Sequence, residues 1–186
     1  TYKELQQQIH QFAAGLLSLG LTKGDRVALI SEGRNDWVIS ELAILYCGAI
    51  NVPISVKIDE LSDLKFRLLH SECKFVIVSL NQLPKIQKIK QDLPYLEKTI
   101  ILDSKEQIES DEILKSEIYK IGKEYLLTNK ENFEQLYNSI LESDYANICY
   151  TSGTTADPKG IILTHRNYTA NIEQSSAILD IPEWFV

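Results

Sequence analysis

Short apolar segments alternate with helix-like segments through the first hundred residues, and this alternation restricts the possible folds more than any other feature. Strands that are apolar on both faces and separated by helices are typical of a parallel sheet covered by helices on both sides. We therefore predict the α/β class, with a mostly parallel sheet flanked by helices. The predicted strands are VALI at 27–30, AINVP at 49–53, FVIVS at 75–79 and TIIL at 99–102.

The segments between these strands carry helix signals. Thr1 and Glu4 have the spacing of a capping box, in which each side chain satisfies a free backbone amide at the start of a helix. Apolar residues follow at helical spacing as far as Gly20, whose backbone freedom suits the end of a helix. Two further helices are predicted at 35–47 and 59–70.

The remainder of the chain divides into a charged stretch and a final unit. Residues 103–143 show no strand pattern, and their weak amphipathic character favours a solvated helical connection. YANICY at 145–150 and GIILTH at 160–165 predict two strands, and 166–179 returns to a helical pattern. The expected organisation is an α/β core (1–102), the helical connection (103–143), and a strand, loop, strand and helix (144–186).

Charge and composition exclude several classes of protein. The net charge is −7, with no basic cluster beyond the loose PKIQKIKQ at 84–91, so nucleic acid is not an expected partner. The longest apolar run, at 42–50, is about half of the roughly 20 residues of a membrane span, so no integral membrane segment is predicted. Cys47, Cys73 and Cys149 lie in apolar stretches without metal-site spacing, which favours reduced thiols and a cytoplasmic location.

The segment YTSGTTADPKG at 150–160 carries the clearest chemical signal. Glycines let the backbone approach a ligand closely, Lys159 adds a mobile positive charge, and Pro158 stiffens the loop. It is not a Walker A loop, because no Ser or Thr follows the lysine and the next element is a predicted strand. A polar connection without a ligand is the alternative. The hydroxyl donors are Thr151, Ser152, Thr154 and Thr155.

The order of residues within this loop resembles a family signature. Nine of the ten positions from Thr151 to Gly160 match TSGTTG-x-PKG, the motif of the adenylate-forming superfamily of acyl-CoA synthetases, peptide synthetase adenylation domains and luciferases. The departure is Ala156, where the family usually has glycine; this substitution resembles acyl-CoA synthetases that act on long-chain fatty acids. The resemblance extends over roughly 1–79 and 144–179 and implies part of the large N-terminal AMP-binding domain of these enzymes.

The resemblance also implies a reaction and a set of site residues. A carboxylate, here expected to be a long-chain fatty acid, would be activated by ATP as an acyl-adenylate and then transferred to the thiol of coenzyme A. Mg²⁺ would accompany ATP, and Lys159 would offset charge as pyrophosphate leaves. Packing in the core is preferred for Tyr150, and a structural or hydrogen-bonding role for His165. The implied phosphate-binding residues are Thr151, Ser152, Gly153, Thr154, Thr155, Lys159 and Gly160.

Alternatives remain at this stage. Within the family the acyl acceptor could be a carrier-protein phosphopantetheine, or oxygen as in luciferases; outside it, the chain could be a non-catalytic binding domain. The chain lacks methionine and begins within a helix signal, so we expect a fragment. Later family motifs are not found in it, and the chain alone is expected to be inactive. Peripheral membrane association of the full protein stays open.

Overall fold

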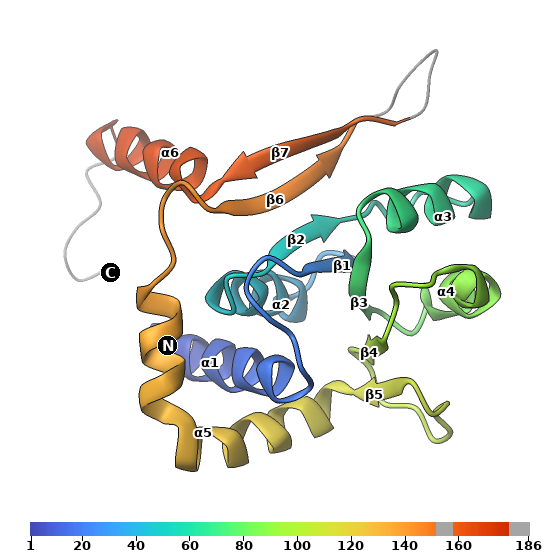
Figure 1. The fold of residues 1–186 in the computed structure, drawn as a ribbon, viewed down its shortest axis with the longest axis horizontal. Coiled ribbons are helices and arrows are strands. Elements are labelled where there is room, and N and C mark those ends of the chain that lie inside the picture. The colour runs from blue at the N-terminus through green and yellow to red at the C-terminus, as the bar shows by residue number, and fades with distance from the viewer. Residues whose placement is uncertain (152–157, 179–186) are drawn as a thin grey trace.

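A seven-stranded sheet organises the structure, a computed structural model that describes residues 1–151 and 158–178 (Figure 1). The strand order is β5-β4-β3-β1-β2-β6-β7. Every neighbouring pair is parallel except β6 and β7, so the prediction of a mostly parallel sheet is confirmed. The strands are β1 (Arg26–Ile30), β2 (Ile50–Pro53), β3 (Cys73–Val78), β4 (Lys98–Ile101), β5 (Glu112–Leu114), β6 (Tyr145–Tyr150) and β7 (Gly160–Thr164).

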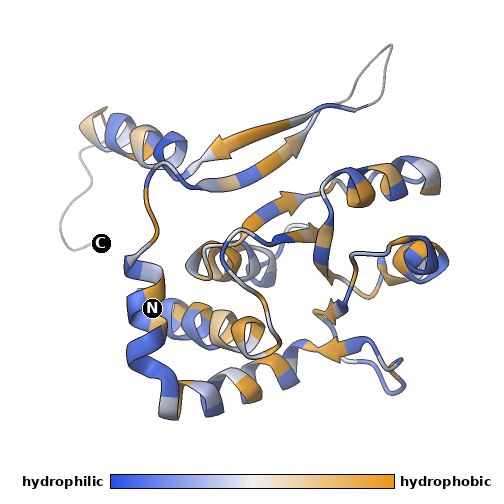
Figure 2. Ribbon diagram, viewed as in Figure 1, coloured by the Kyte–Doolittle hydropathy of each residue, from blue (hydrophilic) through white to orange (hydrophobic). Residues whose placement is uncertain are grey.

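Helices cover both faces of the parallel part of this sheet. Val27 and Leu29 of β1 point into one buried cluster with α1, α2 and α5, whereas Ala28 and Ile30 point into a second cluster with α3 and α4. Alternate residues of a strand face opposite sides, which explains why the central strands are rich in apolar residues on both faces (Figure 2). The helices are α1 (Tyr2–Ser18), α2 (Asn35–Tyr46), α3 (Leu61–His70), α4 (Leu83–Ile89), α5 (Lys115–Asn138) and α6 (His165–Ile178), with a short 3-10 turn at Lys90–Asp92.

The predicted start of the first helix is confirmed. The Thr1 hydroxyl accepts a hydrogen bond from the Glu4 amide at 3.2 Å, and the Glu4 carboxylate accepts one from the Thr1 amino group at 2.7 Å. Gly20 follows the last turn with φ of +93°, a left-handed conformation that a residue with a Cβ rarely adopts. Local sequence therefore defines both ends of α1.

The charged stretch 103–143 differs from its prediction. It contains a strand, β5, which pairs in parallel with β4 at the edge of the sheet. Its helix, α5, is not simply solvated: Ile118, Gly122 and Phe133 are buried, and the helix packs closely on α1. The physical reason is a narrow apolar stripe hidden among many Lys and Glu residues. The short helix α4 was also not predicted.

The last described elements form an arm beside the layered core (Figure 1). Strands β6 and β7 make an antiparallel hairpin, and β6 joins the rest of the sheet through one parallel pair, Asn51 with Asn147. Within the residues that the structure describes, no helix combines the length and apolar character needed to cross a membrane. Thr151 and Lys159 lie at the tip of the hairpin, after β6 and before β7 respectively.

Candidate functional site

The tip of the β6–β7 hairpin presents the ends of the predicted phosphate loop. Thr151 and Lys159 are exposed, and the Thr151 amide donates a hydrogen bond to the Lys159 carbonyl oxygen at 3.1 Å. This bond closes the neck of the loop and brings a hydroxyl and an ammonium group to the same end of the hairpin. The predicted residues Ser152, Gly153, Thr154 and Thr155, together with Ala156, lie outside the described residues.

Gly160 packs closely against side chains of β6 beneath the loop. A Cβ at this position would lie 3.0 Å from the Ile148 side chain and 3.5 Å from the Tyr150 ring. The first contact is tighter than nearly all real Cβ contacts, so glycine allows β7 to approach the side chains of β6. Close packing of the hairpin therefore accounts for a small residue at this position without a ligand.

Tyr150, the last residue of β6, is anchored to helix α3. Its hydroxyl lies 2.8 Å from Nδ1 of His70 and donates a hydrogen bond to the Arg67 carbonyl oxygen at 3.2 Å. The Arg67 guanidinium carbon lies 5.4 Å from the centre of the tyrosine ring, within cation–π range. Tyr150 also packs against the α3–α4 cluster, which confirms the packing predicted for it. Burial raises the pKa of its phenol, so the hydroxyl stays protonated at neutral pH.

A polar hollow of about 380 Å³ adjoins Tyr150 at the carboxyl end of β2. Parallel sheets commonly bind ligands at the carboxyl ends of their strands, and Tyr150, which lines this hollow, directly precedes the loop. Its charged lining is mixed, with both cations and carboxylates. The lining residues are Pro53, Ile54, Ser55, Lys57, Ile58, Asp59, Glu60, Asp63, Arg67 and Tyr150.

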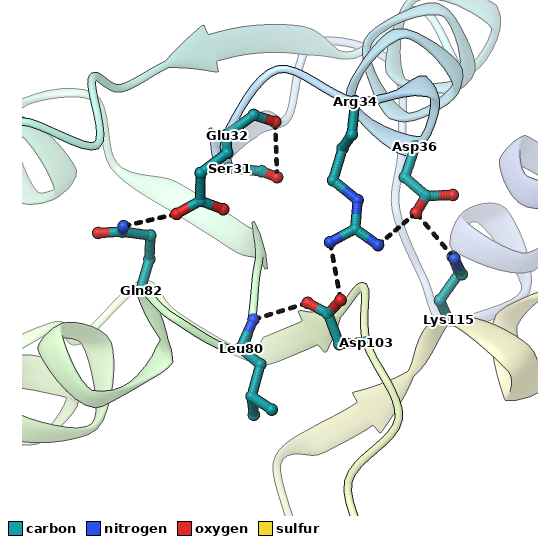
Figure 3. Close-up of polar contacts among 8 residues, drawn as sticks. All are labelled: Ser31, Glu32, Arg34, Asp36, Leu80, Gln82, Asp103 and Lys115. Atoms are coloured by element: carbon teal, nitrogen blue, oxygen red, sulfur yellow. Dashed lines mark hydrogen bonds and ion pairs between the residues drawn. The ribbon is translucent and has the colours of Figure 1, made fainter.

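A second polar cluster joins the carboxyl ends of β1, β3 and β4 (Figure 3). Arg34 bridges Asp103 at 2.7 Å and Asp36 at 2.8 Å, and Lys115 reaches Asp36 at 2.9 Å. The Leu80 amide donates to Asp103 at 2.8 Å. Each carboxylate here has a cationic partner, so the cluster links strand ends and helix starts. Sequence reasoning did not predict these contacts, which join residues up to 79 positions apart.

Glu32 lies beside this network with its own partner. Gln82 donates a hydrogen bond to its carboxylate at 2.9 Å, and this bond, with a further one from the backbone of Glu32, lowers the pKa of Glu32 to about 2. The carboxylate therefore stays ionised across the physiological range. The pair ties the loop after β1 to the start of α4 (Figure 3).

His165 begins helix α6 rather than ending β7. Its amide donates to the Asp144 carbonyl oxygen at 3.0 Å, while its Nε2 atom is buried without a hydrogen-bond partner among the described residues. Burial lowers the pKa of its imidazole, against the opposing effect of Asp144, which favours the neutral ring. It lines an apolar hollow with Leu45 and Tyr137. The backbone contact agrees with the structural role predicted for His165.

The donor set at the hairpin tip is suited to a polyphosphate. Lysine and hydroxyl groups are typical donors to phosphate oxygens, and both types are exposed there. In the described ranges 1–151 and 158–178, no group of three or more His, Cys, Asp or Glu side chains is arranged to hold a metal ion. We therefore assign none of these described residues to Mg²⁺.

Comparison with known proteins identifies the family. The model of the family described as "AMP-binding enzyme" matches residues 1–184. The chain therefore belongs to the AMP-binding enzymes, as the resemblance of the loop indicated. The matched region includes the α/β core as well as the hairpin.

Similar proteins are ligases of acyl groups. The chain is 32% identical over 188 residues to a long-chain-fatty-acid–[acyl-carrier-protein] ligase of Arabidopsis thaliana, covering 95% of the chain and 25% of the plant protein. It is 30% identical over 187 residues to a peroxisomal acyl-CoA ligase of Penicillium brevicompactum, covering 91% of the chain and 26% of the fungal protein. The chain thus spans about a quarter of the length of these relatives.

A solved structure shares the fold. A long-chain-fatty-acid-CoA ligase from Archaeoglobus fulgidus aligns with 95% of the chain and 32% of its own, with a TM-score of 0.76 and 24% sequence identity. A luciferase from Phrixothrix hirtus aligns with 95% of the chain and 33% of its own, with a TM-score of 0.75 and 24% identity. The predicted fold class, a mostly parallel sheet flanked by helices, is therefore confirmed.

Proposed function

We propose that the protein containing this chain is an ATP-dependent ligase that activates a fatty acid as an acyl-adenylate and then forms the coenzyme A thioester. The observation that carries the proposal is the hairpin tip, where Thr151 and Lys159 meet at a closed neck within the TSGTTADPKG sequence of an AMP-binding enzyme. Relatives whose names specify acyl-CoA or long-chain fatty-acid ligases support this assignment.

Within this proposal the loop binds the β- and γ-phosphates of ATP. Its hydroxyls and backbone amides donate to phosphate oxygens, and Lys159 stabilises the negative charge of departing pyrophosphate. Mg²⁺, when bound with ATP, offsets further charge on the phosphates. The proposed binding residues are Thr151, Ser152, Gly153, Thr154, Thr155, Lys159 and Gly160.

Hydroxylamine trapping of the acyl-adenylate tests this function directly. The full-length protein would be assayed with MgATP and unbranched acids from acetate to palmitate, beside a Lys159→Ala variant. We expect trapping to peak with long-chain acids, and the substitution to reduce kcat/KM about 100-fold, because one preorganised donor to a developing charge contributes on this scale. Absence of acid-dependent trapping would refute the ligase, and full activity of Lys159→Ala would refute the role of the loop.

We also propose that the 186 residues alone do not catalyse the reaction. The support for this proposal is length: the chain spans about a quarter of the length of the ligases that it resembles, so a catalytic unit as long as theirs needs further residues. Acid-dependent release of pyrophosphate by the isolated chain, at the rate of the full protein, would contradict this.

A carrier-protein acceptor is the second candidate. The plant relative is named as a ligase that uses acyl-carrier-protein, and it resembles this chain as closely as the coenzyme A ligases do. Parallel assays with coenzyme A and with phosphopantetheinylated carrier protein would separate the two acceptors.

A cytoplasmic location and any peripheral membrane contact stay predictions, because similar proteins carry chloroplastic, peroxisomal and mitochondrial names.

A further inference from the structure

We propose that His70, at the end of helix α3, is a positioning residue that sets the phosphate loop through Tyr150. The inference rests on the proposed function, since it concerns how the same loop is held. His70 lies 80 positions before Tyr150 in the chain, and the parallel sheet brings α3 beside the end of β6. The geometry points to a chain of contacts that runs from the helix to both ends of the loop.

The first step of this chain is an exposed imidazole that contacts two aromatic rings. The His70 ring stacks on Phe66, one turn earlier in α3, with centroids 5.4 Å apart and an angle of 17° between the planes. Its other neighbour is Tyr150, whose ring meets it edge-on at 5.8 Å. A ring held on two sides has few alternative rotamers, so its Nδ1 atom presents a defined partner to the tyrosine hydroxyl.

The second step is the tyrosine hydroxyl itself. It donates to the Arg67 carbonyl oxygen and therefore accepts from, rather than donates to, Nδ1 of His70 when both bonds form together. Arg67 is held in turn by Asp63 at 2.9 Å, and its guanidinium lies over the tyrosine ring. Three contacts from one helix thus define the position of the side chain of Tyr150.

The third step reaches the loop. Tyr150 is followed directly by Thr151, whose amide closes the neck on Lys159, and the Tyr150 ring lies beneath Gly160. A shift of the ring would move both ends of the loop together. Because β6 joins β2 through a single pair, Asn51 with Asn147, contacts from α3 add a second attachment between the hairpin and the core.

Steady-state kinetics of the full-length protein test this role. For His70→Ala we expect KM for MgATP to rise about fivefold, the scale of one lost hydrogen bond, while KM for the acid changes by less than about twofold. His70→Asn places an amide near the Nδ1 position and should recover most of the loss. Tyr150→Phe keeps the ring but removes the hydroxyl and its contacts to both His70 and Arg67, so KM for MgATP should rise at least as much as in His70→Ala.

Tyr168→Phe is the matched control. Tyr168 lies on α6 and its hydroxyl accepts a hydrogen bond from Asn147 at 2.8 Å, so this variant also removes one phenol contact to β6, away from the loop. It should leave KM for MgATP unchanged. An unchanged KM in His70→Ala, or an equal rise in Tyr168→Phe, would overturn the inference.

Hydrogen exchange separates this inference from the proposed function. The amide of Thr151 should exchange faster in His70→Ala than in the wild type, with or without turnover, because its bond to Lys159 depends on the anchored tyrosine. Equal exchange rates would refute the anchor even in an active enzyme. Faster exchange in a protein that activates no acid would support the anchor and refute the ligase.

Discussion

Replacing Gly122 by alanine tests the close contact between α1 and α5. A Cβ on Gly122 would lie 1.8 Å from the Gln11 carbonyl oxygen and 2.7 Å from the Gly15 nitrogen. Real Cβ contacts essentially never fall below 3.0 Å, and these atoms belong to the backbone, so no side chain can rotate away. The helices would have to separate by about 1.2 Å, which disturbs the packing of Ile118 as well.

The expected cost follows from two opposing effects. Overpacking in a close-packed interior destabilises by about 1–3 kcal/mol, and a backbone clash belongs at the upper end. Alanine is a better helix former than glycine by about 1 kcal/mol, which opposes the loss. We therefore expect the free energy of unfolding to fall by about 2 kcal/mol, which lowers the urea midpoint by roughly 1 M for a slope of about 2 kcal/mol/M.

Urea unfolding followed by circular dichroism measures this change. Gly33→Ala is the control, since a Cβ there meets no atom within 4 Å and the backbone has no positive φ. It should stay within about 0.5 kcal/mol of the wild type. If Gly122→Ala were as stable as Gly33→Ala, the close approach of α1 and α5 would be wrong.

Two further predictions concern ionisable groups. Burial raises the pKa of Asp103, but the Leu80 amide and Arg34 oppose this effect and hold the pKa below its usual value. The ionised carboxylate therefore stabilises the folded protein above about pH 4, and this stabilisation is lost as the pH falls through the lower pKa of the folded state. Asp103→Asn should therefore cost about 1–2 kcal/mol at pH 7 and less near pH 3, as urea midpoints at the two pH values would show; an equal cost at both would contradict this. Burial raises the pKa of Cys47 strongly, so iodoacetamide should label Cys149 first in the native protein, as peptide mass spectrometry would report; equal labelling of the two would contradict the burial.

Local patterns located most of the core elements. The four predicted central strands agree with β1 to β4 within two residues at each end, because uninterrupted apolar runs identify strands buried on both faces. Helix α4 was not predicted, because its lysines were interpreted only as part of a loose basic segment. Pro84 in its first turn, followed by Ile86 and Ile89 one turn apart, was the available signal.

The charged stretch shows where local reasoning stops. Strand β5 has three residues, which is too short for a period of two to be recognised. In α5 the buried face is narrow, and part of it is Gly122, which contributes space rather than hydrophobicity. A search for apolar residues does not detect a contact that depends on glycine, where the absence of a side chain lets two helix backbones approach each other.

The candidate site divides in the same way. Residue types and order in the loop were sufficient to identify the adenylate-forming family, which the family comparison confirmed. The anchoring of Tyr150 by His70 and the bridge from Arg34 to Asp103 were not predictable. Both contacts join side chains on different elements of the fold. The sequence around one partner does not specify the other.

The sequence by itself determined the class of fold, the capped first helix and the family to which the loop belongs, because each depends on neighbours within a few residues. Only the tertiary structure decided the strand order, the contact of α5 with α1, and the helix that holds the base of the loop. The physical reason is that hydrophobic periodicity reports which face of an element must be covered, whereas the covering partner follows from how all the elements pack together.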